Sequence, residues 1–407
     1  MASKKSTSHF YIIKHLNDQS KMKTVFFVLW GDPKFYQTLI FLAQNLSKKG
    51  FNIFILSKNT KKAKKIIKNV NFGKNSKLIV CPNFISGYSN QVDYFFFIFF
   101  VLINYFIKKP GKIIFFNKKA LFTSVLLNIF KLKKTKFIYH NFDFELIGDV
   151  NKLKEKLLIR FEFFCSKKCE YLIFPSQNRS KLFKLKSKNK SSKIYSFMNC
   201  FPLKNEIKIS NKLKKILSKN NLEKKKIICY LGSIGPDHYL VEIVRSFKYL
   251  NDDIILIIGG ISINNYTLIL KNIISKNKLD HKVYIFENIT NEFWFDILNN
   301  SILGLCFYKP SVLSHKYMAG TSQKFNNYLL FKKPMLVNEN KDFNNFKKKF
   351  DIFNMVNPQN PKNISNEIKN LIYKSSRYKN IKKNMKRSFE KELNFETQFA
   401  NSYDKIL

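Results

Sequence analysis

The chain has 407 residues and a mass of 48.3 kDa, which is more than one hydrophobic core usually supports, so we expect two domains. A formal charge of +46 would suit a protein that binds nucleic acid or an anionic membrane surface. Phosphate and base recognition favours arginine, whereas these cations are nearly all lysine, so the composition argues against nucleic acid and for a general lysine bias.

The first twenty residues show no clear period and no apolar run before Lys21 and Lys23, so we expect a flexible arm over 1–20 and no signal peptide. The first domain is expected over 21–203. Short β-branched or aromatic runs alternate there with helix-length segments, which predicts a parallel sheet covered by helices. The expected strands are Thr24–Trp30, Phe51–Ser57, Lys77–Cys81, Lys112–Phe116, Lys136–His140 and Tyr171–Phe174.

Two helices of this half stand out. One is expected over Phe35–Lys48 and ends before Gly50, a residue type suited to the left-handed position that follows a helix. The other covers the most apolar stretch, Tyr94–Ile107, which is too short to span a membrane. We therefore expect it to be a buried core helix or an interfacial segment.

The sequence becomes lysine-rich and loses its strand period over 204–226, which we take as the linker between domains. The same alternation resumes in a second domain over 227–385, followed by a helical tail over 386–407. The expected strands of the second domain are Ile227–Leu231, Ile254–Ile258, Lys282–Ile285, Ile302–Phe307 and Pro334–Val337. Two facing sheets of this kind predict an interdomain cleft, with ligands bound outside the carboxyl ends of the strands.

Six cysteines are scattered along the chain, and only Cys165 and Cys169 are spaced for neighbouring helical turns. No histidine is close to that pair in sequence, so we expect buried free thiols rather than zinc, in a reducing compartment such as the cytoplasm. A peripheral position on the inner face of the membrane would fit the basic charge as well.

Glycine is scarce, at 12 of 407 residues, yet it clusters after two expected strands. Gly232 and Gly235 follow the first strand of the second domain, and Gly259-Gly260 follows the next. Such a strand-to-helix turn lets a backbone approach a phosphate closely, although the same turn is as often purely structural. We predict a helix that begins near His238 or Tyr239.

Thr321-Ser322-Gln323-Lys324-Phe325-Asn326-Asn327-Tyr328-Leu329, followed by Pro334, resembles the motif "PNKLFEYMAAGLPVI" of family 4 glycosyltransferases. Further segments resemble this family in the expected order. They are Phe174–Arg179 ("PSENR"), Asn199 with Pro202 ("N.P"), Tyr230-Leu231-Gly232 ("YLG"), Phe137–Glu145 ("YHNHE") and Asp93-Tyr94 with the apolar run after it. The resemblance implies an α/β protein of the GT-B fold, with two facing Rossmann-like domains, and it favours a core helix for the apolar run.

The resemblance also implies a transfer reaction, retaining and independent of metal, in which a sugar moves from a nucleotide-sugar donor to a glycan or lipid-linked acceptor. No cofactor beyond the donor is expected. The implied catalytic residues are His140, Asp143 and Lys324, and Gly31 and Asp32 belong to an acceptor loop. The implied nucleotide-sugar-binding residues are Gly232, Ser233, His238, Gly259, Ser322, Lys324, Asn327 and Tyr328.

The chain also departs from the family pattern. Asn327 and Ala319 stand where the family commonly has a pair of glutamates, and a neutral hydrogen bond to a ribose contributes less than a charged one. Three alternatives stay open: a noncatalytic GT-B-like partner of another transferase, a nucleotide-sugar epimerase and a basic nucleic-acid-binding protein. For His140 and Asp143 the plainer interpretation is a satisfied strand-end residue and a helix cap.

Overall fold

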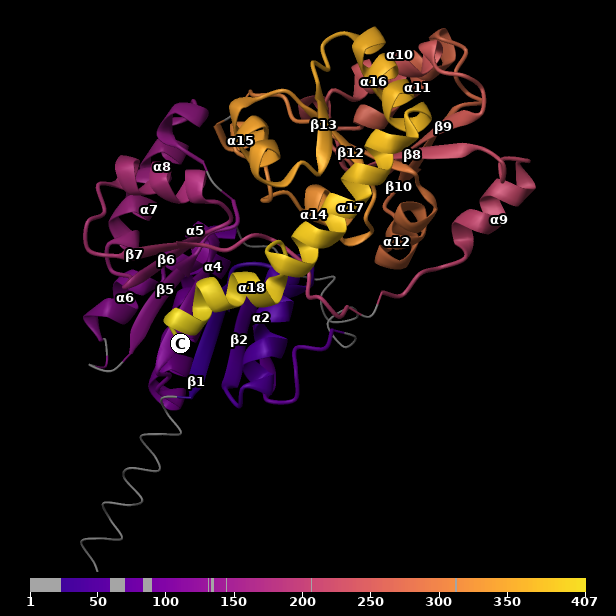
Figure 1. Ribbon diagram of the computed structural model, residues 1–407. Coiled ribbons are helices and arrows are strands. Elements are labelled where there is room, and N and C mark those ends of the chain that lie inside the picture. The colour runs from indigo at the N-terminus through magenta and orange to yellow at the C-terminus, as the bar shows by residue number, and fades with distance from the viewer. Residues whose placement is uncertain are drawn as a thin grey trace, which may run out of the picture. The chain divides into compact units, whose positions relative to one another are not determined.

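The computed structural model describes residues 23–58, 70–82, 90–130, 132, 135–143, 145–205, 207–311 and 313–407 (Figure 1). The chain divides into two compact units. One contains Met1–Phe197 together with Ser402–Leu407, and the other contains Met198–Asn401. The expected arm over 1–20 lies outside the described residues.

The first unit is built on a seven-stranded parallel sheet in the order β3-β2-β1-β4-β5-β6-β7. All six expected strands are present, and three have the expected bounds. The seventh, β7, was missed because its four residues follow a run of lysines and serines. The strands are β1 (Thr24–Leu29), β2 (Asn52–Lys58), β3 (Ser76–Cys81), β4 (Lys112–Phe116), β5 (Lys136–His140), β6 (Tyr171–Phe174) and β7 (Lys193–Ser196).

The helices of this unit connect strands that run in one direction, so right-handed crossovers place α2 on one face of the sheet and the later helices on the other. The expected helix over Phe35–Lys48 is present as a short 3₁₀ turn, Pro33–Phe35, and α2, and Gly50 follows it with φ +81°. The α-helices are α2 (Gln37–Lys48), α4 (Asn90–Lys108), α5 (Asn117–Leu121), α6 (Ser124–Ile129), α7 (Leu153–Ser166) and α8 (Gln177–Ser187).

Of the two expectations for the apolar run, a buried core helix or an interfacial segment, the first is wrong for α4, which is buried on one face only. Among the described residues it is the one helix long and apolar enough to cross a membrane, judged by length and composition alone. Its window Gln91–Lys108 has a mean hydropathy of 1.4, but only 17% of that window is buried. One face, with Phe97, Val101 and Tyr105, packs into the core, while large apolar side chains on the opposite face are exposed.

The last six residues return to the first unit, so the expected tail over 386–407 is divided between the units. Tyr403 and Ile406 are buried there, and the Lys112 ammonium donates to the carbonyl of Leu407 over 2.9 Å. Lys49 pairs with Asp404 on the same segment. The C-terminus is thereby fixed to the sheet of the first unit.

The second unit has a six-stranded parallel sheet in the order β10-β9-β8-β11-β12-β13. The five expected strands are present, and β13 was missed because its sequence lacks a β-branched run. The strands are β8 (Lys226–Ile234), β9 (Ile254–Ser262), β10 (Val283–Glu287), β11 (Leu303–Cys306), β12 (Met335–Asn338) and β13 (Phe353–Val356).

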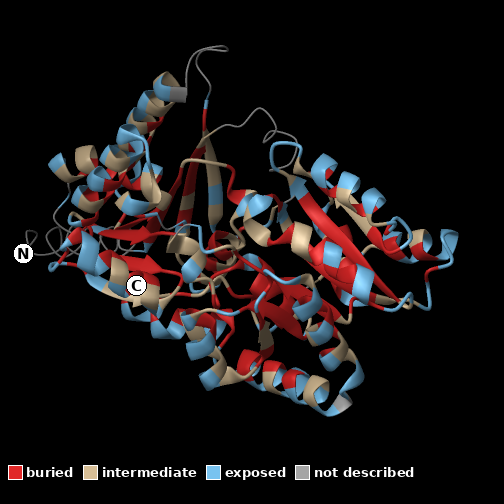
Figure 2. Ribbon diagram, turned by 90° about the horizontal axis from the view of Figure 1, so that it is seen from above, coloured by how far each residue is buried: buried red, intermediate tan, exposed pale blue. Residues whose placement is uncertain are grey.

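The helices of the second unit surround this sheet, and the buried strands contrast with the exposed outer faces of the helices (Figure 2). They are α9 (Lys212–Lys219), α10 (Leu240–Ser246), α11 (Tyr266–Lys276), α12 (Asn291–Asn300), α13 (Leu313–Lys316), α14 (Gln323–Leu330), α15 (Lys341–Phe350), α16 (Pro361–Tyr373), α17 (Ser375–Lys391) and α18 (Phe395–Asn401). The six cysteines of the chain are free and buried, as expected.

The segment expected to be a linker, 204–226, is a packed part of the second unit. It contains α9, whose Leu213 and Leu217 are buried against α12. The Asp296 carboxylate accepts from the Leu213 N–H over 2.8 Å and from the Ser210 hydroxyl over 3.1 Å. Lysine-rich composition therefore marked an amphipathic helix and not a loose connection.

The register between β8 and β9 places Gly232 beside Gly260. A Cβ added at Gly260 would lie 1.7 Å from the carbonyl oxygen of Gly232, so the two strand ends meet only because this residue has no side chain. This close approach lets both strands extend past the rest of the sheet.

We predict that Gly260→Ala lowers the free energy of unfolding of the second unit by about 3 kcal/mol, because the added methyl group must push β8 and β9 apart. Urea unfolding followed by circular dichroism measures the change. Gly148→Ala is the matched control, since nothing lies within 4 Å of its added Cβ. Equal stability of the two variants would contradict the close approach.

Candidate functional site

The predicted residues of the second unit gather where the strand order reverses. β8 neighbours β11 in the sheet, although the strands β9 and β10 lie between them in sequence, and this reversal of the strand order is a topological switch point. Ligands of open parallel sheets bind outside the carboxyl ends of the strands at such a point. Helix α14 begins there with Ser322 as its N-cap, and the spacing of Lys324, Asn327 and Tyr328 places them on one face of that helix.

Tyr328 fixes α14 to the switch point. Its hydroxyl accepts from the N–H of Leu231 in β8 over 3.3 Å and lies 3.1 Å from the carbonyl oxygen of Leu305 in β11 and 3.2 Å from that of Cys229. The ring is fully buried. Tyr328 is therefore a structural anchor that positions the rest of the helix face.

Lys324, one turn earlier, has a buried ammonium without a hydrogen-bond partner. Its Nζ lies 3.8 Å from the ring centroid of Tyr230 and 4.8 Å from that of Tyr308. Burial lowers the pKa of this amine from 10.5 to about 8. Aromatic faces stabilise the cation but leave its three N–H donors unused, so the site is prepared to meet an anion.

Gly232 makes room for this amine at the carboxyl end of β8. A Cβ added there would lie 2.9 Å from Lys324 Cε and 3.3 Å from its Nζ. A group of the protein therefore does approach Gly232 closely, as predicted. That group is the side chain of Lys324.

Asn327 follows Lys324 by nearly one turn and is 2% exposed. Its Oδ1 is buried without a hydrogen-bond partner. Neighbouring Asn326 instead uses its amide N–H groups to hold the carbonyls of Gly320 and Ser322, each over 2.9 Å. Both amides keep a buried Oδ1 without a hydrogen-bond partner, and Asn326 in addition braces the turn before α14 through its N–H groups.

His238 also belongs to this cluster. Its Nδ1 donates to the carbonyl of Phe307 over 3.2 Å, which leaves Nε2 as an unprotonated acceptor. Burial, reinforced by the charge of Lys324, lowers the pKa of His238 to about 3. His315, which the sequence analysis missed, lies 6.1 Å from it between ring centroids and donates through Nδ1 to the Lys309 carbonyl over 2.9 Å.

The other predicted residues of this unit have local structural roles. Ser233 is exposed, and its carbonyl accepts from the Tyr230 hydroxyl over 2.7 Å. Gly259 leaves space that Leu231 and Ile289 fill, since an added Cβ would lie 2.7 and 2.8 Å from them. Ser322 caps α14 and bonds the Tyr308 hydroxyl.

The glycine segment differs from the expected turn. Gly232 and Ser233 lie within β8, which continues to Ile234. A 3₁₀ turn over Pro236–His238 and Tyr239 in the left-handed conformation then precede α10. The expected helix is present, but its first amides belong to residues well beyond Gly232, so Lys324 is the group that faces this glycine.

In the first unit, His140 ends β5 and is fully buried. Its Nδ1 lies 2.7 Å from the hydroxyl of Tyr403, while its Nε2 has no hydrogen-bond partner. The rings of Phe142 and Phe197 pack around it, and burial lowers its pKa to about 3. His140 is therefore neutral at physiological pH and is suited to hydrogen bonding rather than to accepting a proton.

Asp143, three residues later, is exposed, and its carboxylate accepts from the Asn117 amide over 3.3 Å. Asn117 was missed by the sequence analysis. It follows β4 with φ +65°, and its Oδ1 accepts from the N–H of Phe142 over 2.8 Å, so it holds the chain that carries Asp143. The sequence signal that could have identified Asn117 is its position directly after β4, the strand that lies beside β1 in the sheet.

The acceptor-loop residues follow β1. Asp32 is buried and accepts from the N–H of Lys34 over 3.0 Å, so it caps the 3₁₀ turn, and it also pairs with the ammonium of Lys34 over 3.3 Å. The carbonyl of Gly31 accepts from the Ser57 hydroxyl over 2.7 Å. These contacts shape the loop between β1 and α2.

A separate carboxyl lies behind β5. Glu162 of α7 is buried, and its Oε1 accepts from the Tyr139 hydroxyl over 2.6 Å and from the Asn141 amide over 3.1 Å. Burial raises the pKa of Glu162 to about 7. These two hydrogen bonds brace the strand end that carries His140.

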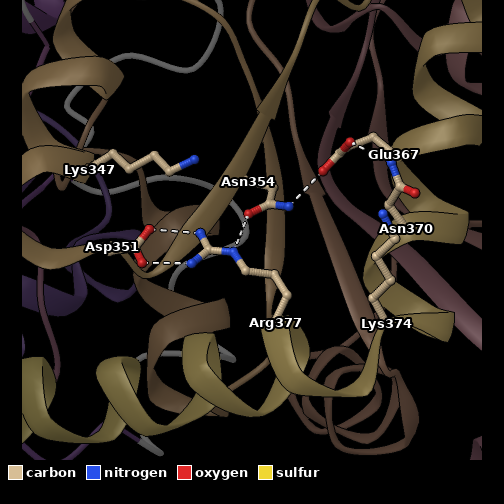
Figure 3. A pocket seen from close by; sticks show the side chains of 7 residues that line it. All are labelled: Lys347, Asp351, Asn354, Glu367, Asn370, Lys374 and Arg377. Carbon is tan, nitrogen blue, oxygen red and sulfur yellow. Dashed lines mark hydrogen bonds and ion pairs between the residues drawn. The ribbon is translucent and has the colours of Figure 1, made fainter.

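A polar pocket of about 400 Å³ lies elsewhere in the second unit (Figure 3). The Arg377 guanidinium forms two bonds to the Asp351 carboxylate, over 2.6 and 2.7 Å, and donates to Asn354 over 2.9 Å. Asn354 in turn donates to Glu367 over 2.6 Å. These groups satisfy one another, and Asp351 precedes β13, so the pocket lies at the opposite strand end from the one where ligands bind.

No group of three or more His, Cys, Asp or Glu residues that could hold a metal ion occurs among the described residues.

Comparison with solved structures shows the fold. HepE of Anabaena in complex with UDP and glucose is similar over 94% of this chain and 99% of its own, with a TM-score of 0.72 and 12% identity. The chain has the GT-B fold. Sucrose-phosphate synthase of Thermosynechococcus elongatus is similar at a TM-score of 0.70 and 12% identity, covering 94% of this chain and 98% of its own.

A Listeria monocytogenes protein described as a UDP-N-acetylglucosamine 2-epimerase is also similar, at a TM-score of 0.63 and 10% identity over 94% of this chain and 95% of its own. No protein-family model matches this sequence. No curated protein matches it by sequence either.

We predict that Lys324→Met raises the free energy of unfolding at pH 7 by up to about 3 kcal/mol, because the folded state holds the amine at a pKa near 8 instead of 10.5. The cost of burying the charge is fully present below pH 8 and disappears as the pH rises towards 10.5. Urea unfolding at pH 7 and pH 10 measures this difference. Lys271→Met, on an exposed face of α11, should show no such gain; a gain shared by both variants would refute a buried ammonium.

The buried imidazole of His140 leads to a second prediction about the pH dependence of stability. Its pKa is 6.5 when unfolded and about 3 when folded, so the unfolded state binds the proton first and stability falls as the pH drops below 6.5. The contribution approaches about 1.4 kcal/mol per pH unit. The measurement is the slope of the free energy of unfolding against pH between pH 6 and pH 4. This slope should become flatter in His140→Phe. It should stay unchanged in the control His281→Gln, because the side chain of His281 is exposed. An unaltered slope in the first variant would show that His140 titrates normally.

Proposed function

We propose that this protein is a glycosyltransferase that moves a sugar from a nucleotide-sugar donor to an acceptor. The observation that carries the proposal is the buried ammonium of Lys324, which has no hydrogen-bond partner and lies at the switch point of the second sheet. A desolvated cation with unused donors stabilises an anion strongly, and a nucleotide diphosphate is the anion that a nucleotide-sugar releases.

Other groups of the cluster suit the rest of such a donor. The unpaired Oδ1 of Asn327 can accept a hydrogen bond from a ribose hydroxyl. The Nε2 of His238 is held as an acceptor by the bond from Nδ1 to Phe307, and it would receive a hydroxyl of the sugar or ribose. Support also comes from HepE, which has this fold and was solved with UDP-glucose.

In the transfer step the bond between the sugar and the diphosphate breaks and negative charge grows on the departing phosphate, while the oxygen of the acceptor hydroxyl forms the new bond to the sugar and its proton passes to that phosphate. Lys324 would neutralise that charge as it develops, which is the main catalytic need of the reaction. We propose retention at the sugar and independence of metal, on the resemblance to family 4 glycosyltransferases. His140 and Asp143 would then contribute hydrogen bonds on the acceptor side, with Gly31 and Asp32 in the acceptor loop.

A glycan or a lipid-linked sugar is the proposed acceptor, and the protein would act in the cytoplasm. An epimerase is the second candidate, favoured by the similarity to the Listeria protein and by the same anion site. A noncatalytic partner is the third, favoured by Asn327 and Ala319 in place of the family's glutamates.

The test is calorimetry with a panel of nucleoside diphosphates, followed by product analysis with the matching nucleotide sugars. We expect one diphosphate to bind, and Lys324→Ala to weaken binding at least tenfold and turnover about a hundredfold. Lys271→Ala should change neither. Binding should also weaken as the pH rises through about 8, because the free amine loses its proton there.

Each alternative has its own outcome. Binding without any turnover would indicate the noncatalytic partner, and a product epimerised at the sugar would indicate the epimerase. Failure of every nucleotide to bind, or equal binding by wild type and Lys324→Ala, would sink the proposal. A gel shift that weakens with salt and persists in Lys324→Ala would favour nucleic acid.

A further inference from the structure

Helices α4 and α7 of the first unit each present a row of large apolar side chains to solvent. On α4 the row is Phe95, Phe99, Ile103 and Phe106, which are 60%, 41%, 57% and 43% exposed. On α7 it is Leu153, Leu157, Phe161 and Phe164, which are 70%, 52%, 39% and 49% exposed. The spacing of four, four and three residues is the same in both rows and places each row on a single face of its helix.

The two rows are joined by the segment that contains α6. The ring of Phe130 packs on Phe106 of α4 at 5.7 Å between centroids, and Phe122 packs on Phe161 of α7 at 4.8 Å. Ile129 and Phe130 are themselves 67% and 49% exposed. We call the two rows, together with Ile129 and Phe130 on the segment that contacts both helices, the α4–α7 apolar face.

The size of the face sets it apart from ordinary surface. Side chains of this kind offer about 200 Å² each, so eight of them, near half exposure, present roughly 800 Å² of apolar area. A typical monomer shows no contiguous patch larger than about 300–600 Å². Something other than water is therefore expected to cover the α4–α7 apolar face.

The charged residues on α4 and α7 indicate which kind of partner covers the α4–α7 apolar face. The exposed charged residues of α4, α7 and the two positions after each helix are Lys108, Lys109, Lys154, Glu155, Arg160 and Lys167. All but Glu155 are cations. Two copies of a chain with a formal charge of +46 repel each other, whereas anionic lipid attracts such a rim.

We propose that the α4–α7 apolar face docks on the surface of a bilayer that contains anionic phospholipid. The apolar rows enter the boundary between headgroups and acyl chains, and the surrounding lysines and arginine meet the lipid phosphates. Helix α4 lies on the bilayer and does not cross it, because Phe97, Val101 and Tyr105 on its inner face are fully buried. The Tyr105 hydroxyl also accepts from the N–H of Leu132 over 2.7 Å, which ties the helix to the unit.

Co-flotation of the whole protein with vesicles tests the proposal. One set of vesicles is pure phosphatidylcholine and the other adds about 30% phosphatidylglycerol. We expect binding to the anionic vesicles, at least fivefold weaker binding to phosphatidylcholine alone, and a loss of binding as NaCl rises from about 0.1 M to 0.5 M, because salt screens the rim.

The decisive variant is Phe95→Ser/Phe99→Ser/Ile103→Ser, which should reduce binding at least tenfold. Its matched control is Ile261→Ser/Leu268→Ser/Ile269→Ser, in the second unit, where the replaced side chains are 62%, 60% and 49% exposed. The control should bind as the wild type does. Both variants should keep the wild-type thermal midpoint, since every replaced side chain is exposed.

Other outcomes would overturn the proposal. They are no flotation of the wild type with anionic vesicles, equal binding to both kinds of vesicle, and an equal loss in the control. Analytical ultracentrifugation tests a further outcome that would overturn it. If the wild type were a dimer without vesicle binding, and the decisive variant were a monomer, the face would bind a second copy of the chain. Lys324→Ala should float as the wild type does, so a failure of the proposed enzymatic function leaves this result interpretable.

Discussion

A buried ammonium without a hydrogen-bond partner is the constraint around which the second unit is arranged. Burying a charge is unfavourable unless something offsets the loss of water, and here the faces of Tyr230 and Tyr308 do so only in part. The remaining cost shows as the lowered pKa of Lys324. Stability alone would favour an apolar side chain of similar length at this position.

The surrounding fold explains how that amine is kept in place. Tyr328 joins α14 to both β8 and β11, so the helix face that carries Lys324 cannot turn away from the strand ends. Gly232 leaves the space that the amine occupies, and Gly260 lets the neighbouring strand run past it. The GT-B fold provides this switch point, and the rings of Tyr230 and Tyr308 enclose the amine there.

The buried polar residue of the first unit, His140, has different surroundings from those of Lys324. His140 is enclosed by aromatic rings, and its one polar partner, the Tyr403 hydroxyl, comes from the far end of the chain. Burial keeps this imidazole neutral, in contrast to the cation of the second unit. The same unit exposes large apolar side chains on α4 and α7.

Much of this protein could be derived from the sequence. Short β-branched or aromatic runs predicted eleven of the strands, because burial on both sides of a parallel sheet demands apolar stretches of that length. Lys324, Asn327 and Tyr328 could be named because helical spacing places them on one face. Short strands such as β7 and β13 escaped, since their pairing with a neighbour, and not their own sequence, makes them strands.

Only the tertiary structure decided what each predicted residue touches. Composition could not show that α4 is exposed on one side, because an apolar helix in a core and one at a surface have the same sequence pattern. Nor could it pair His140 with Tyr403, separated by 263 positions, or leave the Lys324 amine without a partner. Local patterns determine which elements form, whereas burial and hydrogen bonding depend on residues that only the folded chain brings together.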